Sequence, residues 1–499
     1  MPVDKNAEER LRQAVEANPE DATLHNDLGN ELLALGQTAE AIESYQTALR
    51  LTPDRGEIHF NLANALVAAG KNDEALESFQ RSVQFAPDSA GAHNNLGNLL
   101  RTLKRPTEAL ESYRRAMHLS PRDASIRYNI GTALIDLYRI EEALVWFEQA
   151  VRAQPPYAPA ACAGGEALVR LGRLQEALQW FDLAKRLRPG DPNARLGEGL
   201  ALLTLGHLRE GWTGFEARVE DRRVREAFPA VTGATWRGKE DINGRTMLIY
   251  AEQGFGDVIQ FVRYVPLLRA RGARVVLRVP APLISLLRPL PDRIMDSNAP
   301  VPKHDLHCPL LSLPLAFDTR LATIPAQVPY LSADREHLAM WKRRLGPKRG
   351  LRLGLALSGN PQHGLDGLRS IPAADFAPVL KQQGVEFHLL QKLVPEADVP
   401  VLREAGVQIH SQALRGFSDT AALIAHMDHV ISVDSSPAHL AGAMAKPLWI
   451  MLQFDCDFRW MRDRSDSPWY PTARLFRQPA MREWRPVIEA VAEALPAAR

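Results

Sequence analysis

Residues 246–261 read TMLIYAEQGFGDVIQF, and this stretch decides the fold of the second half of the chain. The apolar run TMLIY (246–250) has the composition of a buried strand, and two glycines, an acid and an amphipathic run follow it. This is how a mononucleotide-type βα unit begins. The third glycine of the dinucleotide fingerprint G-x-G-x-x-G is absent, because position 259 is Ile. The stretch therefore predicts a βα turn that holds something other than a dinucleotide.

Apolar runs of similar length continue beyond this turn and alternate with helical stretches such as 257–272 and 419–427. Alternating strands and helices predict parallel sheets, in which ligands gather at the carboxyl ends of the strands. The linker-like GPKRG (346–350) precedes a fresh strand and divides the region into two Rossmann-like halves, 223–345 and 346–499, with a cleft between them. The further predicted strands are RVVLRV (274–279), LRLGLAL (351–357), EFHLL (386–390), HVISV (429–433) and PLWIML (447–452).

The first half of the chain carries an internal repeat of 34 residues. A small residue is followed after twelve positions by Ala, then by an aromatic residue and by proline. The pattern resembles the tetratricopeptide repeat, in which small residues let paired helices approach and proline ends the second helix. We therefore expect an α-solenoid over residues 1–222, with residues 6–19 as a leading helix and an atypical last repeat. The small residues are Gly29, Ala63, Gly97, Gly131, Gly165 and Gly199.

Composition places few limits on function. The 499 residues are 45% hydrophobic and 24% charged with a formal net charge of +1, so no global field recruits nucleic acid or an anionic membrane. Three distant cysteines without a CxxC pair are typical of a reducing compartment. The polar N-terminus does not resemble a signal peptide, and no run of about 18 apolar residues predicts a membrane span. We expect a cytoplasmic protein.

A column of amides runs through the repeats. Asn61, Asn95 and Asn129 each lie two residues before a small position, on the helix that normally lines the concave face. An amide can donate to and accept from a peptide group, so the column predicts capture of an extended polypeptide. The array resembles that of the nucleocytoplasmic O-linked N-acetylglucosamine transferases, whose asparagine ladder binds protein substrates. The alternative is a merely solvated helix face.

Three strand ends of the C-terminal half carry groups suited to a diphosphate. The strand HVISV leads through Asp434 into SSPAHLAGA (435–443), which predicts a helix N-terminus that favours phosphate. A glycine-rich loop with an arginine follows a second strand, and Gln and Lys follow a third. No Walker lysine follows a glycine loop, which argues against an ATPase. The predicted donor-binding residues are Asn360, His363, Arg369, Gln391, Lys392, Asp434, Ser435, Ser436 and His439.

The two βα turns, GFGD (254–257) and the turn at 434–443, look like those of the ADP-heptose:lipopolysaccharide heptosyltransferases, which have the GT-B fold. The resemblance covers roughly residues 240–495 and implies that the second turn holds a sugar nucleotide. Ser436 stands where the family usually has glycine. Joined to the repeats, the chain resembles bacterial tetratricopeptide-repeat glycosyltransferases, some of which modify flagellins or other proteins. The stretch 483–495 would then be the terminal helix that crosses between the halves.

The same resemblance implies that Asp257 is the general base that deprotonates the acceptor hydroxyl, with Gly254 and Gly256 giving the acceptor room. A helix dipole at this position favours the ionised carboxylate and a low pKa. A low pKa makes a weak base, so orientation of the acceptor is part of the expected role. The alternative is an Asp that only caps the helix.

The sequence thus predicts a metal-independent GT-B glycosyltransferase without a cofactor, which uses a nucleotide sugar and a protein acceptor, flagellin-like or another secreted protein. Asp455-Cys456-Asp457 has the letters of a metal-binding DxD motif but follows a strand of the donor half. Two alternatives stay open. One is transfer to a lipid-linked or lipopolysaccharide glycan, and the other is a scaffold with a decayed transferase, to which the unusual segment Gly364–Leu368 points.

Overall fold

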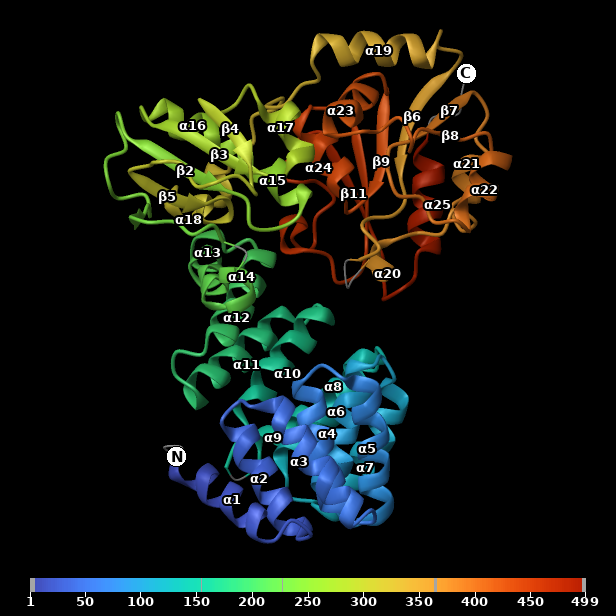
Figure 1. Ribbon diagram of the computed structural model, residues 1–499. Helices are drawn as coiled ribbons and strands as arrows, with labels where there is room; N and C mark the ends of the chain where they lie inside the picture. The colour runs from blue at the N-terminus through green and yellow to red at the C-terminus, as the bar shows by residue number, and fades with distance from the viewer. Residues whose placement is uncertain (1–4, 154, 227, 363–365, 496–499) are drawn as a thin grey trace. The chain divides into compact units, whose positions relative to one another are not determined.

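The computed structural model describes residues 5–153, 155–226, 228–362 and 366–495. The chain divides into two compact units, the first formed by residues 1–171 and 175–189 and the second by 172–174 and 190–499. Helical repeats form the first unit, and parallel sheets with covering helices make up most of the second (Figure 1). No helix among the described ranges combines the length and apolar character needed to cross a bilayer.

The first unit is a stack of helical hairpins, so the predicted α-solenoid is confirmed. The leading helix corresponds to the predicted stretch 6–19, and each later hairpin packs on the one before it. The helices are α1 (Lys5–Ala17), α2 (Ala22–Ala34), α3 (Thr38–Leu51), α4 (Gly56–Ala68), α5 (Asn72–Phe85), α6 (Ala90–Thr102), α7 (Pro106–Leu119), α8 (Ala124–Asp136), α9 (Ile140–Val151), α10 (Ala158–Arg170) and α11 (Leu174–Leu187).

Close packing inside each hairpin explains the 34-residue pattern. A Cβ atom placed on Gly97 would lie 2.5 Å from Cε1 of Tyr113, and one on Gly131 would lie 2.4 Å from Cε1 of Phe147. Glycine therefore lets the aromatic ring of the second helix lie directly against the backbone of the first. These rings are fully buried, and burying a large aromatic side chain contributes about 1.5–3 kcal/mol.

The last helix pair, α12 (Pro192–Thr204) and α13 (Leu208–Phe215), belongs to the second unit. Trp212 of α13 is 1% exposed and meets the rings of Phe261, Phe458 and Trp469 edge-on, at centroid distances of 5.6–6.4 Å. The atypical sixth repeat thus shares the hydrophobic core of the α/β region. The predicted domain boundaries at 222 and 345 stay predictions.

The first sheet is parallel throughout, in the order β1-β5-β2-β3-β4. Its strands are β1 (Ala234–Thr235), β2 (Thr246–Tyr250), β3 (Arg274–Val279), β4 (Arg293–Asp296) and β5 (Leu306–Pro309). The helices around it are η1 (Glu216–Glu220), α14 (Arg222–Glu226), α15 (Phe255–Phe261), η2 (Val262–Tyr264), α16 (Val265–Ala270), α17 (Ala281–Leu287), η3 (Leu310–Ser312), α18 (Leu313–Ala316), η4 (Leu321–Thr323) and α19 (Arg335–Leu345).

The second sheet has the order β11-β10-β9-β6-β7-β8, which is the Rossmann order, and all its pairings are parallel. Its strands are β6 (Leu351–Ala356), β7 (Val385–Leu389), β8 (Gln408–Ile409), β9 (His429–Val433), β10 (Leu448–Leu452) and β11 (Ala473–Arg477). Its helices are α20 (Asp366–Arg369), α21 (Ala377–Leu380), α22 (Asp398–Glu404), α23 (Phe417–Ala425), α24 (Ser436–Ala443), η5 (Phe458–Trp460) and α25 (Arg485–Ala494).

Two helix predictions need correction. The stretch 257–272, expected as one helix, forms α15, η2 and α16, with Pro266 in the first turn of α16. Proline cannot donate the backbone hydrogen bond of a helix interior, so it stands where a new helix begins. The expected crossover helix is α25, but it packs on α21 and β11 of the second sheet, where Val487 and Val491 join that sheet's core.

Candidate active site

Two βα turns, one from each sheet, face each other in the second unit. The first follows β2 and begins α15 with the exposed Gly254 as N-cap; the second follows β9 and begins α24 with the buried Ser435 as N-cap. Helices α15 and α24 pack together (Figure 1). A Cβ atom placed on Gly256 would lie 2.8 Å from Cδ2 of His439, so this glycine makes room for the histidine ring. The carboxyl ends of both sheets therefore meet at one place.

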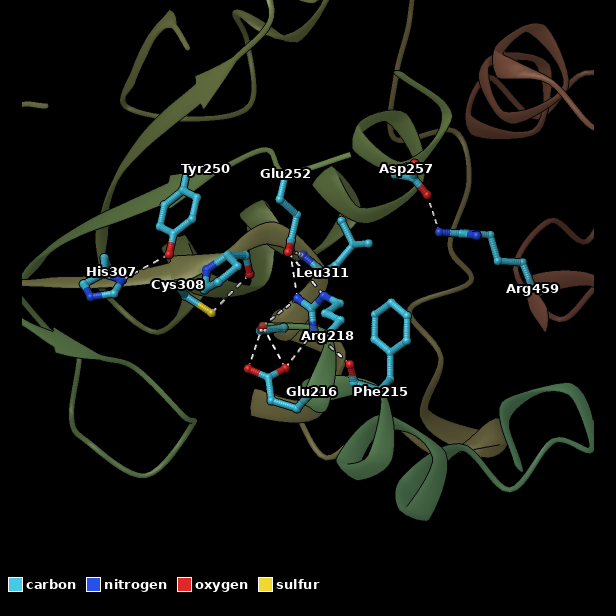
Figure 2. A network of polar contacts seen from close by, with 12 residues as sticks. Phe215, Glu216, Arg218, Tyr250, Glu252, Asp257, His307, Cys308, Leu311 and Arg459 are labelled. Atoms are coloured by element: carbon cyan, nitrogen blue, oxygen red, sulfur yellow. Dashed lines mark hydrogen bonds and ion pairs between the residues drawn. The ribbon is translucent and has the colours of Figure 1, made fainter. Parts of the chain in front are cut away.

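Asp257 is the third residue of α15, so the alternative that it is the helix N-cap is wrong. Its side chain is 18% exposed, and Oδ1 forms an ion pair with Nη2 of Arg459, which comes from η5 of the other half. Nη1 of Arg459 lies 2.7 Å from Oδ1 of Asp457. Figure 2 shows Asp257 and Arg459 pointing toward one another. One guanidinium thus joins carboxylates of both halves.

His439 lies in the second turn of α24 and is 5% exposed. Its Nδ1 lies 3.0 Å from the hydroxyl of Tyr470, its Nε2 lies 3.7 Å from Oδ1 of Asp434, and its ring stacks on Trp460 at 5.3 Å. Burial acts to raise the pKa of Asp434, but His439 and the neighbouring donors outweigh it and lower that pKa. The pair therefore presents a carboxylate and an imidazole beside the N-terminus of α24.

Arg369 connects the glycine-rich loop to the second βα turn. Its Nε donates to Oδ1 of Asp366 at 2.9 Å, and its Nη1 donates to the backbone oxygen of Asp434 at 3.1 Å. A Cβ atom on Gly359 would lie 2.2 Å from Nη2 of Arg369, so the loop passes directly over the guanidinium. The structure thus brings Arg369, Asp434 and His439 together, as the sequence predicts for strand ends of one sheet.

The other residues predicted to bind the donor differ in burial and in hydrogen-bond partners. Gln391 is buried and its Oε1 accepts from the backbone N–H groups of Leu357 and Ser358, so this side chain holds the loop after β6. Asn360 and Lys392 are exposed, and Asn360 accepts from the backbone N–H of Gln362. Ser436 is the first residue of α24, and the hydroxyl of Ser435 lies 3.0 Å from that of Ser432. His363 lies outside the described residues.

A buried ionic network anchors the first βα turn. Nη2 of Arg218 lies 2.8 Å from Oε1 of Glu252, which precedes GFGD, and Nη1 lies 2.9 Å from Oε2 of Glu216. The side chains of Arg218 and Glu252 are 3% and 0% exposed. Glu252 also accepts from the backbone N–H of Leu311 at 3.1 Å. Burial raises the pKa of Glu252 even though Arg218 opposes the shift. Figure 2 shows this network beside the turn that carries Asp257.

In the first unit, the predicted amides pair with amides of the preceding repeat. Nδ2 of Asn61 donates to Oδ1 of Asn26, Nδ2 of Asn95 to Asn64, and Nδ2 of Asn129 to Asn94, at 2.8–2.9 Å. All three side chains belong to half-buried residues. Each amide keeps a second N–H group, and its oxygen keeps at least one lone pair, although Oδ1 of Asn95 already accepts from Nδ2 of Asn94 at 3.5 Å. Pairing therefore leaves bonding capacity for a peptide.

Sequence reasoning missed Arg459, Asp457, Trp460 and Tyr470. All four lie between β10 and β11, a stretch read only for the discounted letters Asp455-Cys456-Asp457. The sequence did contain a signal for these residues, because aromatic and charged side chains directly follow a buried strand. Loops that follow parallel strands lie at the carboxyl edge of the sheet, where ligands bind.

The comparisons with known families agree with this division of the chain. A tetratricopeptide-repeat model matches residues 5–55, 26–90, 60–124, 94–159 and 163–192. A model of glycosyltransferase family 9 (heptosyltransferase) matches residues 415–450, the segment with α23, β9 and α24. The N-terminal region therefore consists of tetratricopeptide repeats, and the C-terminal region is similar to family 9 over a short stretch that includes His439.

Individual proteins and solved structures share low sequence identity with this chain. Protein FlbA of Caulobacter vibrioides is 27% identical over an alignment of 316 residues that covers 57% of this chain and 52% of FlbA, so the chain spans about half the length of this curated relative. Among solved structures, YrrB, a TPR protein described as having an unusual peptide-binding site, is 26% identical, with 38% of this chain and 97% of YrrB covered and a TM-score of 0.33. PilF of Pseudomonas aeruginosa is 20% identical, with 38% and 89% covered and a TM-score of 0.34.

Proposed function

We propose that the second unit is a GT-B-type glycosyltransferase that takes a nucleotide sugar, and that the repeats recruit a protein acceptor. The observation that carries the proposal is the meeting of two βα turns from separate parallel sheets, one with Asp257 and one with His439. The match to family 9 over residues 415–450 supports it, because that segment forms the second turn.

The donor side of the proposal rests on the second sheet. The backbone N–H groups at the start of α24, eight residues long, favour a phosphate, and Arg369 is held beside them by its bond to Asp434. His439 is held by Tyr470 and Trp460 beside the same N-terminus. These groups suit the diphosphate of a nucleotide sugar.

The acceptor side rests on Asp257. A carboxylate can accept the proton of a sugar or side-chain hydroxyl, or orient that hydroxyl, and the accessible backbone at Gly254 leaves space beside it. The expected role of Gly256 differs, because the His439 ring fills the space next to it. In the repeats, the free bonding capacity of Asn61, Asn95 and Asn129 supports capture of an extended segment of the acceptor protein.

Nucleotide binding is the test. The whole 499-residue chain is screened by thermal shift against nucleoside diphosphates and nucleotide sugars, and a ligand at a hundred times its Kd adds about 2.7 kcal/mol of stability. Arg369→Ala should weaken binding by about 1.5–3 kcal/mol, since a charged hydrogen bond is lost. Arg335→Ala, an exposed arginine on α19, is the matched control and should bind as the wild type does.

A second candidate function is a scaffold whose transferase half no longer acts. Two observations favour it: Asp257 is engaged by Arg459, and the family 9 match spans only residues 415–450. A scaffold predicts partner capture by the repeats with no nucleotide raising the melting temperature. That result would end the glycosyltransferase proposal.

A further inference from the structure

Arg459 occupies an unusual position for a structural arginine. It lies in η5, beyond β10, and its side chain is 8% exposed. The guanidinium stands over the rings of Phe458 and Phe261, at 4.5 and 5.5 Å from their centroids. Its Nη groups meet Asp257 and Asp457, while its buried Nε has no hydrogen-bond partner among the described residues. A buried charged donor without a partner is costly, so this site is not fully satisfied.

The charges around Arg459 are unbalanced. Burial opposes its charge, but Asp457 and Asp257 raise its pKa, and Asp434 adds to the effect, so the guanidinium is positive. Three acidic side chains thus act on one arginine, and burial raises the pKa of one of them, Asp457, which favours its uncharged form. A diphosphate that enters this region needs a cation, and Arg459 is an arginine positioned between the two turns.

We propose that Arg459 is a ligand for the donor diphosphate and that it holds Asp257 only while the donor site is empty. The inference rests on the glycosyltransferase function proposed above and adds an order of events to it. The Nη2 group that meets Asp257 turns to a phosphate oxygen when the donor binds. Asp257 is then released to receive the acceptor hydroxyl. Donor binding therefore precedes productive acceptor binding.

The exchange makes a prediction that a static ion pair does not. If Asp257 competes with phosphate for Arg459, removing the charge of Asp257 must tighten nucleotide binding. An ion pair that only joins the two halves of the unit would leave the affinity unchanged, or lower it by loosening the site. The sign of the affinity change in Asp257→Asn separates the two roles.

The experiment is calorimetric titration of the whole 499-residue chain with ADP, UDP, GDP and CDP. The nucleotide that binds most tightly is then titrated into each variant. Arg459→Gln should weaken binding by about 10- to 100-fold, the range of a lost charged hydrogen bond. Asp257→Asn should tighten it several-fold, and the gain should disappear in the double variant because no arginine is left to release. Asp334→Asn, an acid at the N-cap of α19, should match the wild type.

Each outcome decides a separate question. Unchanged or weaker binding in Asp257→Asn overturns the exchange and leaves the proposed function standing. No binding of any nucleotide to the wild type overturns the proposed function and the exchange with it. Circular dichroism checks the fold of every variant. If Arg459→Gln does not fold, Arg459→Lys replaces it, because lysine keeps the charge but cannot bridge two anions as a planar fork does.

Discussion

The repeat array and the second unit differ in how far representative ion pairs are exposed to water. Arg105 and Glu108 in the array form an ion pair whose side chains are 40% and 51% exposed. In the second unit, Arg218 and Glu252 form one whose side chains are 3% and 0% exposed. The array is held by apolar rings against glycines, and water screens its charges. The second unit also buries some of its charges, and each charge removed from water in this way needs a partner.

This difference is consistent with a functional site in the second unit. Buried charge is costly, so a fold that retains it near strand ends gives up stability in favour of a site. The array is built differently, because half-buried amides bind each other between its repeats. Four predictions test this contrast, beginning with the largest expected effect.

Under the proposed function, Asp257→Asn should lower the turnover of sugar transfer by about 10²–10⁴, the usual contribution of a general base. The fold should be kept, because Asn has nearly the same shape. Steady-state transfer to the protein acceptor measures turnover, and thermal unfolding measures stability. Full activity in this variant would falsify the catalytic role of Asp257 and leave the turn as architecture. Asp334→Asn is the control, because it makes the same substitution at an acid at the N-cap of α19 and should keep full turnover.

Arg218→Met should destabilise the second unit by about 3–5 kcal/mol, because Glu252 and Glu216 are left without their buried partner. Arg105→Met in the array should leave the free energy of unfolding nearly unchanged, since both partners of this pair are solvated. Denaturant unfolding of both variants measures the difference. Equal losses would contradict the contrast between the two regions.

Acid should destabilise the second unit as the pH falls below 6.5, because three of its histidines are buried in the neutral form. Burial lowers the pKa of His429 to about 4, and it lowers the pKa values of His388 and His410 to about 4 as well. The unfolded chain binds protons near pH 6.5 and the folded chain does not, so stability falls as pH drops from 6.5 toward 4. At pH 5 each such histidine costs roughly 2 kcal/mol.

The variant that tests this is His429→Phe, since the ring of His429 packs against Trp449 at 4.5 Å and Phe keeps an aromatic group there. Melting temperatures at pH 7.5 and pH 5 are compared with those of the wild type. A smaller drop in the variant supports the assignment. The same drop in both proteins would mean that other groups cause the acid sensitivity.

The smallest effect is expected in the array. Asn95→Ala removes one hydrogen bond between side-chain amides of neighbouring repeats. The free energy of unfolding should fall by about 0.5–1.5 kcal/mol. Replacing Asn61, Asn95 and Asn129 together should weaken capture of the acceptor protein while nucleotide affinity stays the same. Pull-down and calorimetry give the two readouts, and unchanged capture would reduce the amide column to a structural feature.

Much of the fold was predictable because it depends on local patterns. The strand run at 246–250 forms β2 with the predicted bounds, and the 34-residue period gave the helical hairpins. Short strands such as β1, β4, β5 and β8 were missed, since two to four residues give no periodicity. The break at Pro266 was also missed, although proline disfavours a helix interior.

The sequence by itself determined the repeat array, the parallel βα units and the identity of two chemically suited turns, because spacing and residue type act over a few positions. Only the tertiary structure decided that Asp257 meets Arg459, 202 residues away, and that Gly256 receives the ring of His439. Such pairings depend on how two sheets pack, and that is settled by the sum of many buried contacts. Local sequence patterns do not report these long-range contacts, so only the three-dimensional structure identifies the partners of a predicted site residue.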